Sequence, residues 1–277
     1  MLEPELDLGA VGTWTSPLDI TAEPAEAAAY ARATDDPNSS YAHGVTPPLF
    51  VVALVVRPMQ LCIDALANTA AQATIVHARH DVHFHRPVRA GDTVRVSASA
   101  IGVEQRRSGV LAVIRVRTSD GTGAPINDQY ASLLFRGLDR YDRAGESAPA
   151  LVGVEPEGPV TVHERPTTAD QALRYADASG DRNRIHLDAE FARSVGLRGV
   201  ILQGLCTLAM ASRAVTEDLC DGAPTALTRL AARFSAAVIP GDTLEVQVQR
   251  AAGSRHAAFG VQVKGAAVIT ERRAVRT

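Results

Sequence analysis

The chain contains two copies of one sequence pattern, and this repeat limits the folds it can adopt more than any other feature. Residues 30–38 match residues 175–183 at an offset of 145. Further along, residues 86–96 match residues 236–246 at an offset of 150. Two matches in the same order and at nearly the same offset indicate a duplicated structural unit with a small insertion between the matched segments.

The two copies are expected to span residues 1–148 and 149–277, joined by a polar, turn-rich linker around residues 142–159. Each copy has a helical first part and a strand-rich second part. In the second copy, Asp188 is placed to cap a short helix. From Gly204 onwards, apolar residues recur at helical spacing over about four turns.

Strand-like segments with glycine-containing turns follow this long helix. The Gly-Asp turns at residues 90–92 and 240–242 are predicted to be hairpin connections. By periodicity alone, the sequence predicts a duplicated α+β fold.

The composition excludes several classes of protein. The 277 residues are 46% hydrophobic and 21% charged, which is typical of a globular chain. A net charge of −3 gives no general attraction to nucleic acid or to an anionic membrane. Cys62, Cys206 and Cys220 are odd in number and irregularly spaced, which argues against a disulfide framework or a zinc ribbon.

We expect a cytoplasmic protein. The first 14 residues are acidic and lack the layout of a signal peptide. The longest apolar run, residues 49–56, is too short to span a bilayer.

The residues with the most chemical information lie between Tyr175 and Thr207. Asp181, Asn183 and His186 fall within six residues, and Gly204 follows 18 residues after the histidine, at the expected start of the long helix. A general base, a partner and a backbone oxyanion donor are the parts needed to add or remove water beside a carbonyl. An Asp-x-Asn sequence on its own, however, is usually only a turn.

The whole segment, including Ser179-Gly180 and residues 204–207 (Gly-Leu-Cys-Thr), closely resembles the signature of the MaoC-like hydratases. It is most similar to the (R)-specific enoyl-CoA hydratases, or hydratase 2. The resemblance covers nearly all of the chain and implies an α+β double hotdog, in which each antiparallel sheet wraps around a central helix.

The resemblance also implies a reaction in fatty acid metabolism. Asp181 and His186 would hold a water that adds to C3 of a trans-2-enoyl thioester, giving an (R)-3-hydroxyacyl thioester. The backbone N–H of Gly204 would form the oxyanion hole, and Asn183 would brace the catalytic pair. No bound cofactor is implied, because coenzyme A enters as part of the substrate.

Six further residues are predicted to contact the substrate or shape its pocket. They are Tyr175, Ser179, Gly180, Arg184, Arg198 and Gln203. Two of them depart from the family pattern, which usually has proline at position 184 and histidine at position 203. The arginines near the motif are candidates to contact phosphate groups of the carrier. These are Arg182, Arg184, Arg193, Arg198, Arg229 and Arg233.

The first copy is predicted to be inactive and to help shape the acyl pocket. It keeps Asp36 and Asn38, but Tyr41 stands where His186 stands in the second copy. A metal site could be read into a cluster of four histidines, which are His77, His80, His83 and His85. The strand pattern around these histidines favours ordinary strand residues, so no metal is predicted.

Three alternatives remain open from the sequence. The first has an acyl carrier protein of fatty-acid or polyketide synthesis as the substrate carrier instead of CoA. The second is a non-catalytic homologue that binds acyl thioesters, and the third is a thioesterase on the same scaffold. The predicted partners are an acyl thioester and, in one alternative, a carrier protein, with no nucleic acid or membrane. A homodimer of whole chains is left open.

Overall fold

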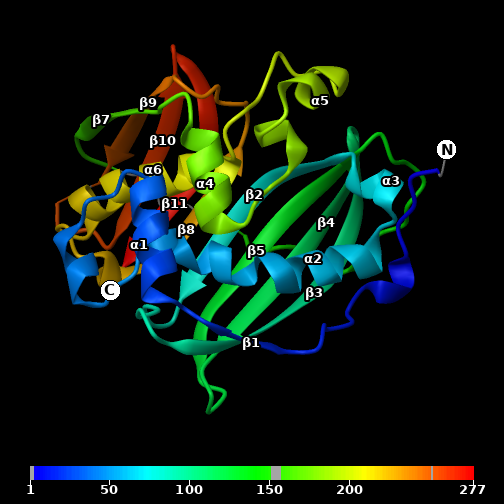
Figure 1. Ribbon diagram of the computed structural model, residues 1–277, viewed down its shortest axis with the longest axis horizontal. Helices are drawn as coiled ribbons and strands as arrows, with labels where there is room; N and C mark the ends of the chain where they lie inside the picture. Colours follow the sequence, from blue (N-terminus) through cyan, green and yellow to red (C-terminus); the bar gives the residue numbers. More distant parts are fainter. Residues whose placement is uncertain (1–2, 151–156, 251) are drawn as a thin grey trace. The chain divides into compact units, whose positions relative to one another are not determined.

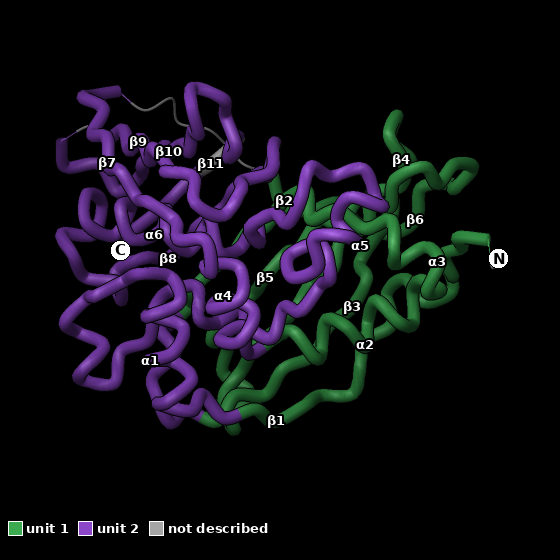
Figure 2. The backbone as a smooth tube through the Cα atoms, turned by 45° about the horizontal axis from the view of Figure 1, so that its top comes forward, with its two compact units in different colours: residues 1–20, 55–85, 93–150 green, residues 21–54, 86–92, 151–277 purple. Residues whose placement is uncertain are grey.

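The computed structural model describes residues 3–150, 157–250 and 252–277 (Figure 1). The chain divides into two compact units (Figure 2). Unit 1 contains residues 1–20, 55–85 and 93–150, and unit 2 contains residues 21–54, 86–92 and 151–277. Residues 21–54, the helical first part of the first copy, therefore belong to unit 2. The copy boundary at residue 148 stays a prediction, and residues 151–156 of the expected linker lie outside the described residues.

Unit 1 is an antiparallel sheet with a helix packed on it. The strand order is β1-β3-β4-β5-β2, and β6 pairs with β3. The strands are β1 (Leu18–Thr21), β2 (Ile75–Phe84), β3 (Thr93–Arg106), β4 (Gly109–Ser119), β5 (Pro125–Arg136) and β6 (Ala144–Gly145). The helical segments are η1 (Leu8–Ala10), α2 (Val56–Leu66) and α3 (Thr69–Gln72).

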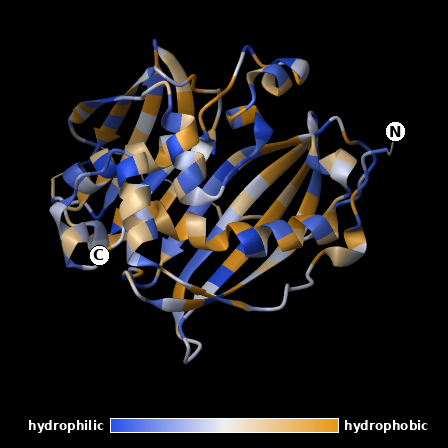
Figure 3. Ribbon diagram, viewed as in Figure 1, coloured by the Kyte–Doolittle hydropathy of each residue, from blue (hydrophilic) through white to orange (hydrophobic). Residues whose placement is uncertain are grey.

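Helix α2 lies across β3 and β4 (Figure 1). It alternates hydrophobic and hydrophilic residues (Figure 3), and its buried residues include Cys62, Ile63 and Leu66. The short helix η3 (Pro48–Val55) leads into it. Together, Pro48–Leu66 are long and apolar enough to cross a membrane by length and composition alone, and 56% of the most apolar window is buried in the structure. That burial is what the core helix of a hotdog requires.

Unit 2 repeats the same plan with its own set of strands and its own helix. The strand order is β8-β11-β10-β9-β7, and these neighbours pair antiparallel. The strands are β7 (Val160–Pro166), β8 (Leu227–Phe234), β9 (Thr243–Gln249), β10 (His256–Val263) and β11 (Ala266–Arg276). The helices are α1 (Pro24–Ala33), α4 (Gln171–Ser179), α5 (Ala189–Ser194) and α6 (Gly204–Leu219), with the 3-10 turns η2 (Ser39–His43), η4 (Arg184–His186) and η5 (Pro224–Ala226).

Helix α6 is the central helix around which this sheet is built. It contacts all five strands, and Leu208, Met210 and Leu219 are almost completely buried. The predicted helix from Gly204 is confirmed. The predicted cap of α5 is also confirmed, because the Asp188 carboxylate accepts hydrogen bonds from the N–H groups of Glu190 and Phe191.

The hairpin prediction for the two Gly-Asp turns was wrong. Residues 240–242 lie between β8 and β9, which are not neighbours in the sheet, and residues 90–92 lie between β2 and β3, which are also apart. A local turn signal identifies the change of direction but not the strand that follows it. All three cysteines are free and buried, as expected.

The two copies meet at equivalent tyrosines within unit 2. Tyr30 of α1 and Tyr175 of α4 are fully buried, with ring centroids 5.5 Å apart and hydroxyl groups 3.3 Å apart. Beside them, the Gln171 amide donates to the Ala33 carbonyl at 2.6 Å. The repeat in the sequence is therefore also a contact in space.

Truncation of the central helix is expected to test this packing. Leu208→Ala should lower the free energy of unfolding by about 2–5 kcal/mol, because it removes a fully buried side chain and leaves a cavity. Leu173→Ala, at a position that is 52% exposed, is the control and should change it by no more than about 0.5 kcal/mol. Urea denaturation measures both, and equal losses would show that α6 is not the core.

Candidate active site

The turn after α4 places Asp181. Helix α4 ends at Ser179, and Gly180 takes a left-handed conformation (φ 79°), which glycine adopts without strain. The buried Ser179 hydroxyl then accepts a hydrogen bond from the Asp181 N–H at 3.2 Å. Ser179 and Gly180 thus fix the direction in which the chain leaves the helix.

Asn183 shapes the next turn. Its side-chain oxygen accepts from the Ile185 N–H at 3.2 Å and caps η4, the turn that ends at His186. The Asp181 carboxylate in turn accepts from the Asn183 N–H at 3.3 Å. These local bonds bring the Asp181 carboxylate to 4.0 Å from the His186 imidazole (Oδ2 to Nε2). The predicted bracing role of Asn183 fits these contacts.

A hydrogen bond to the backbone orients the imidazole of His186. Its Nδ1 lies 2.7 Å from the Ile201 carbonyl oxygen. Because a carbonyl only accepts, Nδ1 is the nitrogen that donates, and in the neutral tautomer with this proton Nε2 is the acceptor. The His186 side chain is 9% exposed and that of Asp181 is 35% exposed. At a separation of 4.0 Å, one water can lie within hydrogen-bond distance of both groups.

Gly204 begins α6, where backbone N–H groups are unpaired and the helix dipole is positive. Gln203, the capping residue, makes no side-chain cap. Among the described residues, no acceptor is recorded for the Gly204 N–H, so it is available to an anionic oxygen.

Phe234, at the end of β8, is the site residue that sequence reasoning missed. A Cβ added to Gly204 would lie only 3.1–3.2 Å from three atoms of its ring. Gly204 therefore makes room for an aromatic side chain 30 residues further along the chain. No motif could have identified this contact, because Phe234 lies in an ordinary strand.

Three predicted substrate contacts are buried in supporting positions. Tyr175 and Gln203 are 0% exposed and Ser179 is 4% exposed. The Gln203 amide donates to the Ala172 carbonyl at 3.0 Å and to the Asp181 carbonyl at 3.4 Å. These contacts favour a supporting role, and direct contact of the three residues with substrate stays a prediction.

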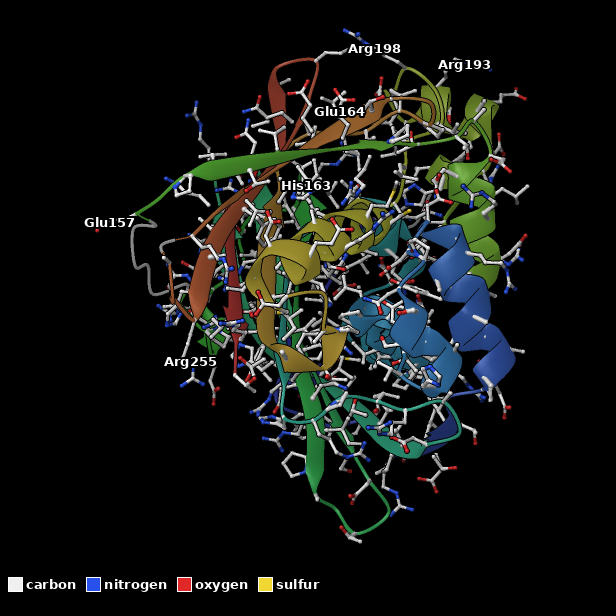
Figure 4. All side chains as sticks on the ribbon, turned by 90° about the vertical axis from the view of Figure 1, so that its left-hand side faces the viewer. Glu157, His163, Glu164, Arg193, Arg198 and Arg255 are labelled. Carbon is white, nitrogen blue, oxygen red and sulfur yellow. The ribbon has the colours of Figure 1, made fainter. Side chains whose placement is uncertain are left out.

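The arginines of the motif divide into two kinds. Arg184 pairs with Asp188 at 2.6 Å and stacks over the Phe191 ring, 4.2 Å from its centroid. Arg193 and Arg198 are exposed (Figure 4), and no ion pair is recorded for either among the described residues. Within the described ranges, these two positive charges therefore have no ion-pair partner.

The first copy preserves the same loop without the catalytic pair. Asn38 caps η2 as Asn183 caps η4, and Asp35 takes the left-handed conformation of Gly180. The Tyr41 hydroxyl donates to the Asp36 carboxylate at 2.6 Å and fills the place of an imidazole and a water. Burial raises the pKa of the Asp36 carboxyl. In addition, the helix that follows begins with Pro48, which has no N–H to offer.

The histidines of β2 are paired within unit 1. His83 lies 3.1 Å from the Asp81 carboxylate, His85 lies 3.0 Å from Asp128, and the buried His80 contacts the Gln129 amide at 3.2 Å. No group of three or more side chains suited to a metal occurs in the parts of the chain that the structure describes. The absence of a metal stays a prediction.

The contact between Gly204 and Phe234 can be tested by stability alone. Gly204→Ala should cost about 1–3 kcal/mol, because the added methyl group meets the ring. In a Phe234→Ala background the same change should cost nothing or stabilise, since alanine favours helix. A double-mutant cycle by urea denaturation measures this, and additive effects would contradict the contact.

The comparisons with known proteins agree with this architecture. Residues 153–271 match the family model of the MaoC like domain, and residues 9–129 match that of the FAS1-like dehydratase domain region. The 3-hydroxyacyl-thioester dehydratase Y of Mycobacterium tuberculosis is 30% identical over 227 residues, which are 80% of this chain and 78% of that protein. The probable enoyl-CoA hydratase 2 of Dictyostelium discoideum is 27% identical over 202 residues, or 70% of this chain and 68% of that protein.

Solved structures agree on the fold. The crystal structure of a MaoC-like dehydratase from Phytophthora capsici has a TM-score of 0.82 at 27% identity and covers 95% of both chains. A conserved hypothetical protein of Mycobacterium tuberculosis, described as a double hotdog, has a TM-score of 0.62 at 16% identity and covers 94% of this chain and 95% of its own. The predicted fold and family are thus confirmed, and the chain belongs to the MaoC-like dehydratases, a family of hydro-lyases with the double hotdog fold.

Proposed function

We propose that the chain catalyses the reversible hydration of a trans-2-enoyl thioester to an (R)-3-hydroxyacyl thioester. The observation that carries the proposal is the Asp181–His186 pair, whose side chains lie 4.0 Å apart while the imidazole Nδ1 lies 2.7 Å from the Ile201 carbonyl oxygen. The names of the relatives, 3-hydroxyacyl-thioester dehydratase and enoyl-CoA hydratase 2, support the same reaction. The (R) configuration rests on this family relationship.

In this mechanism a single water donates one hydrogen bond to Asp181 Oδ2 and its second hydrogen bond to His186 Nε2. A lone pair of the water oxygen then faces C3 of the substrate. As the oxygen attacks C3, one water proton passes to the Asp181 carboxylate, and the C2–C3 π electrons move towards the thioester oxygen. The Gly204 N–H and the positive end of α6 stabilise the negative charge on that oxygen. The proton then returns to C2, so the sum of the steps is the addition of one water.

The substrate carrier is proposed to be coenzyme A. Arg193 and Arg198 follow the catalytic loop in the chain, with no ion pair among the described residues, and a phosphate group would supply a negative charge for them. An acyl carrier protein, which presents a phosphopantetheine arm, is the alternative carrier. No resident cofactor or metal enters the proposed chemistry, because CoA is part of the substrate.

Two further assignments stay proposals. We keep the cytoplasm as the expected location, to be tested by cell fractionation, and a dimer of whole chains, to be tested by light scattering of the purified protein. The thioesterase alternative is not carried further, because the named relatives at the level of sequence are hydratases and dehydratases.

Substitutions in the two copies give a matched test of the catalytic pair. Asp181→Asn and His186→Gln should each lower kcat/KM for a trans-2-enoyl-CoA by about 10²- to 10⁴-fold, because a side-chain amide cannot take up a proton as a carboxylate or an imidazole can. The control is Asp36→Asn, the same change at the equivalent position of the first copy, which should leave the rate unchanged. Loss of the enoyl-thioester absorbance follows turnover.

Two outcomes would contradict the proposal. Equal losses in Asp36→Asn and Asp181→Asn would place the chemistry elsewhere. No turnover by the wild type on CoA or carrier-protein thioesters would favour a non-catalytic binding role.

The carrier is tested by removing the two unpaired charges. Arg193→Gln and Arg198→Gln should together raise KM for the CoA thioester by about tenfold or more with little change in kcat, because they act on binding away from the reacting carbons. The effect should shrink at high salt. Arg140→Gln, at a side chain that is 91% exposed in unit 1, is the control. A KM effect seen only with carrier-protein substrates would identify the alternative carrier.

A further inference from the structure

The side-chain amide of Gln203 donates its hydrogen bonds to the protein backbone. It is 0% exposed, and its amide nitrogen donates to the carbonyls of Ala172 in α4 and Asp181 in the catalytic loop, at 3.0 and 3.4 Å. A glutamine amide has two N–H donors, and both are used here. No donor is left for a substrate carbonyl or phosphate, so the contacts do not favour the substrate-binding role predicted from the sequence.

Gln203 directly precedes Gly204, whose N–H is the proposed oxyanion donor. Its own peptide bond leads to the N–H of Gly204, and its carbonyl accepts the first hydrogen bond of α6, from the Thr207 N–H at 3.1 Å. One residue therefore joins the backbone of the proposed base to the backbone of the proposed oxyanion donor. In the described residues no other side chain is recorded to bond the Asp181 carbonyl.

We infer that Gln203 is a positioning residue, which fixes the separation between Asp181 and the Gly204 N–H. The inference rests on the proposed function, because it concerns the two groups that act on opposite parts of the enoyl thioester. Attack at C3 and stabilisation of the thioester oxygen must occur together, so the base and the donor must keep a fixed distance.

The remaining oxygen of the side chain is consistent with this role. Gln203 Oε1 is buried and has no recorded hydrogen-bond partner. Leaving a buried acceptor unpaired is unfavourable for stability. An apolar side chain of the same length would avoid this cost, so a residue needed only for packing has no reason to be glutamine. The donors are what the site requires.

The test compares two buried glutamines of unit 2. Gln203→Met keeps the length of the side chain and removes the donors. Gln171→Met is the matched control, because Gln171 is also 0% exposed and also donates to a backbone carbonyl, that of Ala33, far along the chain from the catalytic loop. Thermal unfolding of both variants checks that each is folded and measures the shared structural cost.

Steady-state kinetics on a trans-2-enoyl-CoA then separate the roles. For Gln203→Met we expect kcat to fall by about 10- to 100-fold while KM stays within about threefold of the wild type, because the base and the donor are misplaced and the binding surface is kept. Gln171→Met should change neither. Gln203→His, which restores an N–H donor, should recover part of kcat.

Each other outcome overturns the inference. A raised KM with an unchanged kcat would make Gln203 a substrate contact. Equal kinetic losses in Gln203→Met and Gln171→Met, or losses in neither, would make its role purely structural. No turnover by the wild type would overturn the proposed function and this inference with it, whereas turnover by the wild type with a normal Gln203→Met rate would overturn only the inference.

Discussion

The hydrogen bond between the His186 imidazole and the Ile201 carbonyl is the interaction on which the rest of the site depends. At 2.7 Å it fixes which ring nitrogen carries the proton. The N–H of Ile201 also donates to the Ile185 carbonyl at 3.2 Å. Two hydrogen bonds therefore join the two ends of the segment formed by residues 187–200. Three residues later the chain enters α6. The same contact therefore orients the imidazole and lies close to the start of the helix whose first N–H is the proposed oxyanion donor.

The two copies show how little of a shared scaffold needs to change for one site to be lost. The capping asparagine and the left-handed residue before the aspartate are kept in both. In the first copy the residue at the histidine position donates a hydrogen bond to the aspartate instead of accepting one from water. Since Tyr41 occupies the carboxylate and Pro48 has no N–H, the first copy lacks counterparts of both the proposed base and the proposed oxyanion donor.

Local signals predicted the parts of this structure that local chemistry determines. The cap at Asp188, the start of α6 and the loop from Ser179 to His186 all follow from side chains that bond within a few residues. Contacts between distant segments were beyond such signals. The ring of Phe234 over Gly204 and the burial of the Gln203 amide depend on how the sheet wraps around the helix, and the strand order that contradicted the predicted hairpins depends on it too.

The departure from the family pattern at position 184 illustrates how a loop can keep its stiffness by another route. A proline there would restrict the unfolded chain, an effect of about 0.4–1 kcal/mol at compatible positions. Arg184 instead stacks on the Phe191 ring of α5, which contributes about 0.5–1 kcal/mol at an exposed site. Its pairing with the capping residue Asp188 links η4 to α5 as well. Because the two effects are of similar size, the arginine can hold His186 in place of a proline, and a contact of its charge with a substrate phosphate stays a prediction.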